Sequence, residues 1–325
     1  MIVLGIALFS LTALLLLYRF FSQERPFRFP FHGYFGIGVL VAAELFLWAD
    51  LEPVPTYFTP IAWTGYIFWT DAAVFALRGE SLWKSHRAEF VWLAFCSIPL
   101  WLLFEAYNLR LENWIYVGLP RNPWERNFGY AWAFATIWPA IFETATLLRA
   151  LGLGGQGAAP ATGGLPRPQP APPGNTAMTL AILLGAIFLI VPIWVPARIG
   201  AYLFGAVWLG FIFLLEPLNH RSGAPSLWRD IRHKDFSRLL SLLAAGWVCG
   251  IFWEFWNYWA AARWVYIFPI AQDWKLFAMP LPGYLGFPPF AVECFVLFAF
   301  LAPRLTALRA KSAPQAASEW AALRL

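Results

Sequence analysis

Long apolar stretches, separated by short polar or basic segments, run through most of the chain. Most approach the roughly 20 residues that a helix needs to cross a bilayer about 30 Å thick. The pattern predicts an all-α polytopic membrane bundle of about nine transmembrane helices. The second and seventh are short, which suits a tilted helix or one that crosses half of the membrane. The predicted spans are residues 2–17, 34–51, 60–77, 90–107, 129–148, 177–195, 199–215, 239–259 and 282–301.

Composition places the chain among membrane proteins. Hydrophobic residues make up 60% of it and charged residues 13%, and its mean hydropathy is +0.58, values outside the range of soluble globular domains. The net charge of +5 is explained by basic loops that face anionic lipid. We therefore expect membrane lipid as a partner and no nucleic acid. The pattern does not determine an oligomeric state.

The basic residues also predict an orientation. With nine spans, one face of the membrane holds 17 of the 23 Lys and Arg residues and the other holds 6. Because basic residues collect on the cytoplasmic side, the N-terminus is expected outside and the C-terminus in the cytoplasm. An integral protein of a bacterial or archaeal inner membrane fits this pattern.

The chain divides into two similar halves around a segment rich in Gly, Pro and Ala. The first apolar stretch has no basic residue before it and no small-residue cleavage site, so it is expected to remain as an anchor. The predicted regions are an anchor and second helix (1–59), a first three-helix repeat (60–150), a flexible linker (151–176), a sixth helix with a second three-helix repeat (177–302) and a cytoplasmic C-terminal tail (303–325).

The two halves share residues at corresponding positions. Gly65 and Asp71 correspond to Gly210 and Glu216 at a constant spacing. The copies start four helices apart, so we expect parallel repeats related by an axis along the membrane normal, with a shared cavity between them. A longer pattern also recurs in order: Glu105, Asn108, Trp114, Tyr116, Gly129, Tyr130, Pro139 and Glu143, then Glu254, Asn257, Trp264, Tyr266, Gly283, Tyr284, Pro289 and Glu293.

Acidic residues inside apolar stretches are the first functional candidates. A carboxylate that faced lipid at mid-depth would cost roughly 3 kcal/mol, so the repeated acids must face inward. The candidate catalytic residues are Glu105, Glu143, Glu254 and Glu293, and the secondary candidates are Asp71 and Glu216. The alternative is that these acids only join helices through hydrogen bonds worth about 0.6 kcal/mol each. Asp71 and Glu216, near helix ends, fit that alternative best.

The neighbours of these acids suggest how they are held. An Asn three residues after a Glu shares its helix face, so we expect Asn108 and Asn257 to donate to Glu105 and Glu254. A proline bend before Glu143 and Glu293 is expected to free a backbone carbonyl that accepts from the carboxyl group. The candidate substrate-binding residues are Asn108, Trp114, Tyr116, Asn257, Trp264 and Tyr266.

Aromatic residues crowd the second copy of the pattern between Trp247 and Trp274. They suit either a belt at the membrane surface or a pocket for a flat or polyene ligand, in which rings shield a carbocation. The four histidines fall in loops or at helix ends, and Cys and His spacings typical of metal sites are missing. We therefore expect no metal site and no cofactor.

The repeated order of Asn, Trp-Xaa-Tyr, Gly-Tyr, Pro and Glu resembles that of the small membrane lycopene cyclases, of both the fungal domain type and the bacterial and archaeal paired-subunit type. Where that family has Pro-Xaa-Glu-Glu, a single Glu follows each proline here. The residues that carry the resemblance are Asn257, Trp264, Tyr266, Gly283, Tyr284, Pro289, Glu293, Phe295 and Phe298, and in the first half Asn108, Trp114, Tyr116, Gly129, Tyr130, Pro139 and Glu143.

The resemblance implies a non-redox isomerisation of a linear carotenoid or another isoprenoid. Glu293 or Glu143 would protonate a terminal double bond, and Glu254 or Glu105 would remove a proton after ring closure. Two other classes stay open. A transporter or channel would place the repeated acids along a polar path that reaches both faces, and a structural membrane subunit would use its aromatic faces to hold a partner.

Overall fold

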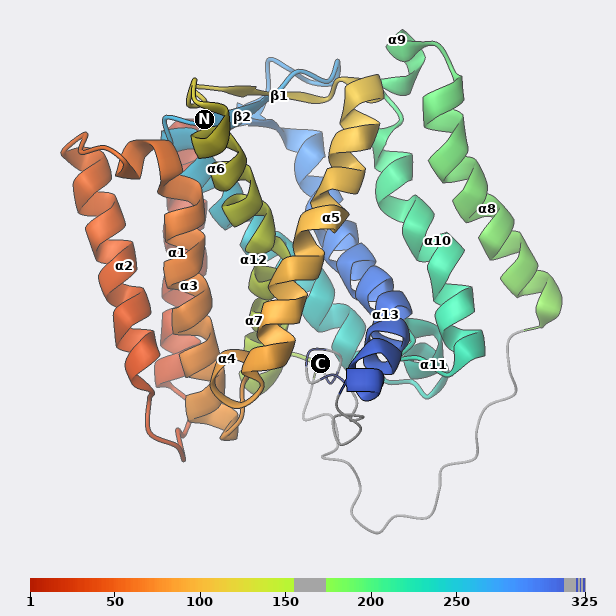
Figure 1. Cartoon of the computed structure of the whole chain (residues 1–325), viewed down its shortest axis with the longest axis horizontal. Helices are drawn as coiled ribbons and strands as arrows, with labels where there is room; N and C mark the ends of the chain where they lie inside the picture. The colour runs from red at the N-terminus through yellow and green to blue at the C-terminus, as the bar shows by residue number, and fades with distance from the viewer. Residues whose placement is uncertain (155–173, 313–319, 321, 323, 325) are drawn as a thin grey trace.

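The computed structural model describes residues 1–154, 174–312, 320, 322 and 324, and these form a helical bundle (Figure 1). Most of the predicted linker, residues 155–173, lies outside the described residues. Within the described part, seven segments are helical, long and apolar enough to cross a membrane, which fits an integral membrane protein. They comprise α1 (Ile2–Phe21), α2 (Phe31–Trp48), α5 (Arg87–Leu111), α6 (Pro123–Ala135) with α7 (Ile137–Ala150), α8 (Asn175–Trp194), α12 (Ser237–Trp259), and η1 (Leu281–Gly286) with α13 (Phe287–Ser312).

The other two predicted spans lie in α3 (Val54–Arg78) and α10 (Phe204–Ser222), which are not among the seven. Both helices contain proline and charged residues, which lower their mean hydropathy. The remaining short elements are α4 (Leu82–Ser85), α9 (Ala197–Gly200), α11 (Leu227–Arg232), and the strands β1 (Trp114–Val117), β2 (Arg263–Tyr266), β3 (Lys275–Leu276) and β4 (Met279–Pro280).

The predicted fifth span is broken rather than continuous. Helix α6 ends at Ala135, and α7 begins after Thr136, whose hydroxyl donates to the carbonyl of Ala133 at 2.7 Å. Pro139 has no backbone N–H to donate, and its ring would clash with the carbonyl of Ala135 in a continuous helix. The proline therefore changes the direction of the chain between α6 and α7.

Short strands join the two halves at one end of the bundle. Strands β1 and β2 pair antiparallel, with Trp114 opposite Tyr266 and Tyr116 opposite Trp264. Figure 1 shows this pair at the same end of the bundle as α9, while α4 and α11 lie at the other end. An all-helical prediction missed the strands, although Trp-Xaa-Tyr between helices has the two-residue alternation of a strand.

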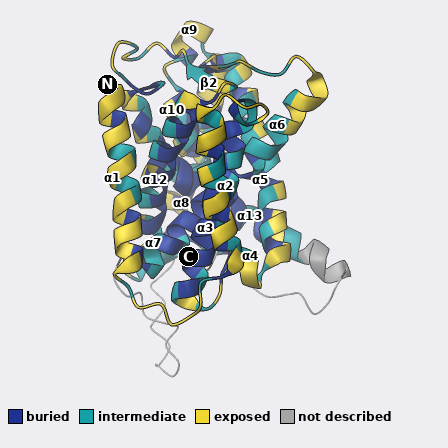
Figure 2. Ribbon diagram, turned by 90° about the vertical axis from the view of Figure 1, so that its left-hand side faces the viewer, coloured by how far each residue is buried: buried dark blue, intermediate teal, exposed yellow. Residues whose placement is uncertain are grey.

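The core lies between the central helices. Helix α12 packs against α3, α7 and α13, α2 packs along α3, and α8 packs along α10. Figure 2 shows the central helices largely buried and α1 and α2 with extensive exposed surface. Phe9 of α1 stacks on Phe255 of α12 at 3.7 Å between ring centroids, so the first helix packs on the second half. The exposed apolar side chains of α1 and α2 suit contact with lipid.

The described part of the predicted C-terminal tail (303–325) begins within a helix. Helix α13 continues to Ser312, and Trp320 folds back against it. The Trp320 indole donates to the hydroxyl of Thr306 at 2.7 Å, and its ring meets that of Phe298 edge to face at 5.4 Å. This end of the chain thus adds to the core.

Candidate functional site

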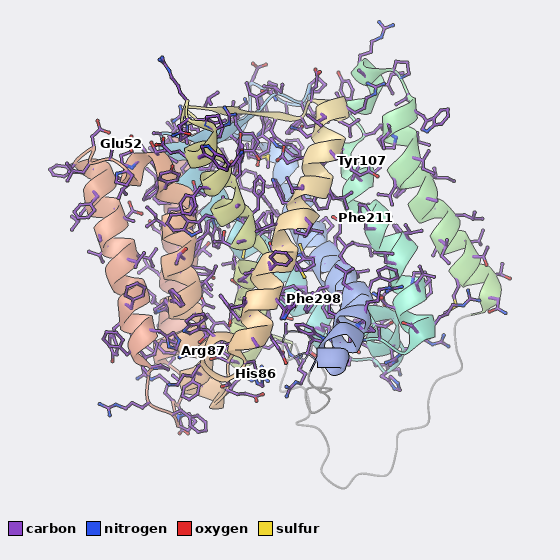
Figure 3. All side chains as sticks on the ribbon, viewed as in Figure 1. Glu52, His86, Arg87, Tyr107, Phe211 and Phe298 are labelled. Carbon is purple, nitrogen blue, oxygen red and sulfur yellow. The ribbon has the colours of Figure 1, made fainter. Side chains whose placement is uncertain are left out.

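A cavity of about 140 Å³ lies beneath the β1–β2 pair, between the two halves. Its walls are mainly aromatic, with indole rings from α3 (Trp63), α5 (Trp101), α10 (Trp208) and α12 (Trp253). Figure 3 shows how densely side chains fill the space between these helices. The walls of the cavity are therefore apolar and largely aromatic.

Four ring side chains of the paired strands lie on one face and line the cavity. Residues two apart in a strand point to the same side, so Trp114 and Tyr116 of β1 lie beside Trp264 and Tyr266 of β2. Each half supplies one Trp and one Tyr. The pairing thus brings the two copies of the repeated pattern together over one cavity.

Behind this face, Glu105 is bound by three donors. Its Oε1 accepts from the Tyr116 hydroxyl at 2.6 Å, from the Trp101 indole at 2.8 Å and from the Trp114 indole at 3.1 Å. The side chain is half-buried. Hydrogen bonds to a carboxylate stabilise its charged form, so these three donors oppose the burial that disfavours a charge at Glu105.

Glu254 occupies the corresponding place in the second half with fewer donors. Its Oε1 accepts from the Tyr266 hydroxyl at 2.9 Å and more distantly from the Trp264 indole at 3.4 Å. It is completely buried, and its Oε2 has no hydrogen-bond partner. Gly250 stands where the first half has Trp101, so one donor is missing. The two acid sites are therefore alike in position and different in their hydrogen bonding.

The two tyrosines connect the acids to the cavity. Burial, and then the neighbouring glutamate, raise the pKa of the Tyr116 and Tyr266 phenols well above 10.0. Both phenols therefore stay protonated at neutral pH. A protonated phenol that touches both a carboxyl group and the cavity can pass a proton between them, accepting one as it gives another away.

The two asparagines do not donate to the glutamates as expected. Asn257 donates to the Trp264 carbonyl and accepts from the Trp264 N–H, both at 2.9 Å. Asn108 likewise donates to the Trp114 carbonyl at 2.9 Å and accepts from the backbone of Asn113 and Trp114. Each lies in the last turn of its helix and holds the start of the following strand. They position the cavity's rings and do not line it.

Asp71 and Glu216 lie at the opposite end of the bundle. Asp71 accepts from the Ser81 hydroxyl at 2.8 Å and the Trp83 N–H at 2.6 Å, at the start of α4. Glu216 accepts from Ser226 at 2.6 Å and the Trp228 N–H at 2.8 Å, at the start of α11. Both carboxylates hold the first turn of a short helix. Neither lines the cavity.

Glu143 and Glu293 are also away from the cavity. Both are completely buried, and no donor reaches either oxygen of either residue. Neither carboxyl group contacts the backbone carbonyl that the proline bend was expected to free. Of the four candidate catalytic acids, the structure brings only Glu105 and Glu254 next to the cavity.

Several residues of the site were not predicted from sequence. Trp63, Trp101, Trp208 and Trp253 come from four helices, and only the fold brings them together. Trp101 carried a detectable signal, since it lies one turn before Glu105 on the same helix face. Among the described residues, no cluster of His, Cys, Asp and Glu has the arrangement of a metal site.

Comparisons with protein-family models, with curated proteins and with solved structures find no match to this chain.

Proposed function

We propose that the chain crosses the membrane nine times, with α3 and α10 as the two further spans, and that its halves are parallel repeats. The proposal is supported by the order of elements: α3, α4, α5, β1 and α6–α7 have counterparts in α10, α11, α12, β2 and η1–α13. The charge distribution supports an external N-terminus and a cytoplasmic C-terminus, as in a bacterial or archaeal inner membrane.

We propose that the cavity binds a carotenoid or another unsaturated isoprenoid and isomerises or cyclises it by acid–base catalysis. The observation that carries this proposal is the pair of Tyr–Glu contacts, Tyr116 with Glu105 and Tyr266 with Glu254, on one aromatic cavity. Indole faces stabilise a nearby cation, and two carboxyl groups in different surroundings divide acid and base roles.

The different surroundings assign the roles. Glu254 is the proton donor, because it is completely buried and has fewer donors than Glu105, with its Oε2 unpartnered, and burial favours the neutral form. When Glu254 is protonated on Oε1, the Tyr266–Glu254 hydrogen bond reverses and the Tyr266 hydroxyl turns toward the cavity. The Tyr266 proton then adds to a double bond, and the Glu254 proton replaces it on the Tyr266 oxygen. Glu105, with three donors, is the acceptor.

The ring then closes as a second double bond attacks the cation, which spreads its charge beneath the indole faces. The cation loses a neighbouring proton to the Tyr116 oxygen as Tyr116 gives its own proton to Glu105. One proton enters the substrate and one leaves it, so no oxidant or reductant is consumed. Proton return from Glu105 to Glu254 resets the site.

The positions of the acids favour this reading over transport. A path for ions or protons across the membrane needs polar groups from one face to the other. Here the cavity is walled by rings, and Glu143 and Glu293 are sealed away from it without donors. Glu143 and Glu293 therefore do not continue a polar path from Glu105 and Glu254 across the membrane.

Pigment analysis of a lycopene-accumulating host that expresses this chain tests the proposal. We expect a cyclised product with the wild type and at least about a hundredfold loss with Glu254→Gln or Tyr266→Phe, the usual contribution of a proton donor. Tyr202→Phe, which removes an exposed phenol from the loop before α10, is the matched control and should keep wild-type conversion. Unchanged pigment with the protein in the membrane would rule out lycopene as the substrate, and full activity of Tyr266→Phe would rule out the mechanism.

A further inference from the structure

A second group of titratable side chains lies at the α4 end of the bundle, opposite the strands. Asp71 of α3 is completely buried and accepts from Ser81 and Trp83. His32, at the start of α2, places its Nε2 2.8 Å from Asp71 Oδ2, and its side chain is 14% exposed. The imidazole therefore stands between the buried carboxylate and the surface.

Glu143 of α7 lies close enough to Asp71 for the two carboxyl groups to interact, where helices α3 and α7 pack together. No donor group reaches either oxygen of Glu143. Two ionised carboxylates repel each other at such a contact, and neither can donate a hydrogen bond. Asp71 already has donors that suit an ionised carboxylate. The contact becomes favourable when Glu143 carries a proton and donates it to Asp71.

The other polar groups around Glu143 and Asp71 add no hydrogen-bond donor to Glu143. They are Arg78 on α3, whose charge acts on Glu143, Tyr66 on α3 with Thr144 on α7 at 2.8 Å between hydroxyl oxygens, and Cys249 on α12, whose thiol contacts Thr144 at 3.5 Å. The Thr144 hydroxyl donates to the Ala140 carbonyl at 2.6 Å or is shared with Tyr66. None supplies a hydrogen bond to Glu143.

We propose that Glu143, Asp71 and His32 form a proton-binding site, in which Glu143 holds a proton shared with Asp71 and His32 exchanges that proton with water at the α4 end. The site is separate from the cavity and does not depend on the function proposed for it. The second half offers a natural comparison. Glu293 is equally buried and without donors, but no acidic side chain among the described residues is seen to act on it.

Infrared difference spectroscopy of the full-length protein in lipid vesicles tests this site, with transfer from H₂O to D₂O as the probe. A protonated carboxyl group has a C=O stretching band that shifts when its proton is replaced by deuterium. We expect Glu143→Gln to remove one such band and Glu293→Gln to remove another. Asp71→Asn should move the Glu143 band and leave the Glu293 band in place.

The kinetic result concerns His32. We expect His32→Gln to keep the Glu143 band but to slow its deuterium shift by at least about tenfold, with the Glu293 band exchanging at the wild-type rate. Near-UV circular dichroism checks that each variant is folded. If Glu143→Gln does not fold, His32→Gln still tests the proposal, because residue 32 lies near the surface. The proposal would be overturned if Asp71→Asn left the position of the Glu143 band unchanged and His32→Gln left its deuterium-shift rate unchanged. A Glu143→Gln spectrum with every band intact would also overturn it.

Discussion

At the scale of single residues, two asparagines determine where the cavity's rings lie. Helix α12 ends at Trp259 and α5 at Leu111, so Asn257 and Asn108 lie where the chain leaves the helix. Short amide side chains readily bond to nearby backbone in such places. By holding both the N–H and the carbonyl of Trp264, Asn257 fixes the first cavity-facing ring of β2.

Removing this amide should loosen the strand pair. Asn257→Ala leaves the Trp264 N–H and carbonyl without their side-chain partner, at about 1–3 kcal/mol for each group that stays buried and unpaired. We expect a lower unfolding temperature in detergent and faster hydrogen exchange of the β1 and β2 amides. Asn127→Ala, on the exposed surface of α6, is the control. Equal behaviour of the two variants would contradict the role given to Asn257.

The sequence identified these residues but not their contacts. Repetition singled out Asn108 and Glu105 together, and helical spacing suggested that they bond to each other. The spacing could not show that β1 returns over the end of α5. There the backbone of β1 forms hydrogen bonds with Asn108, and the side chains of Trp114 and Tyr116 donate hydrogen bonds to Glu105. The residue pattern along one helix cannot reveal a hydrogen-bond partner that lies in the next element of the chain.

At the scale of elements, α12 and α13 approach one another through glycine. A side chain at Gly246 would meet the Phe287 carbonyl and Pro288, and one at Gly250 would meet the Phe287 ring. These two glycines let the helix that carries Glu254 lie against the start of α13. The same absence of a side chain at position 250 removes the donor that Trp101 gives to Glu105.

A methyl group at Gly246 should separate these helices. Because the obstacle is backbone, Gly246→Ala is expected to cost about 1–3 kcal/mol, the usual penalty for overpacking. Gly38→Ala is the matched control, since nothing lies within 4 Å of the added carbon there and alanine favours a helix by about 0.5–1 kcal/mol over glycine. Thermal unfolding followed by tryptophan fluorescence would compare them. A destabilised Gly38→Ala beside an unaffected Gly246→Ala would refute the packing argument.

Apolar length predicted where the long helices lie, because a membrane leaves few other choices. It did not predict the break at Thr136 or the strands. Pro139 was read as a bend within one helix, whereas the chain leaves the helix before it. Strands β1 and β2 are only four residues long, and each becomes regular through its partner in the other half.

At the scale of the whole molecule, the halves meet through aromatic packing. Trp63 of α3 lies 5.0 Å from Trp253 and 4.9 Å from Trp256 of α12, between ring centroids. Tyr107 of α5 donates to the Leu189 carbonyl of α8 at 3.2 Å, which ties the first half to the sixth predicted span (Figure 3). These contacts and the strand pair enclose the cavity.

The proposed topology predicts that the two ends of the bundle face opposite sides of the membrane. The native cysteines are all buried, so they provide a low background for thiol labelling. We expect Arg121→Cys, in the loop after β1, to react with a membrane-impermeant reagent from outside intact cells. Ser222→Cys, at the exposed end of α10, should react only after permeabilisation. Labelling of both from the same side would contradict the nine-span topology.

The pairing of β1 with β2 also constrains how the protein is made. The two strands belong to opposite halves, so the first leaves the ribosome long before its partner. Until β2 has been synthesised, Trp114 and Tyr116 lack the strand that pairs with β1, and the aromatic side chains of the first half are not yet covered by the second half. Contacts between distant parts of a chain form late because the intervening loop must first be closed. The cavity is therefore completed late, and a chain interrupted before residue 263 would lack the β2 rings that close it.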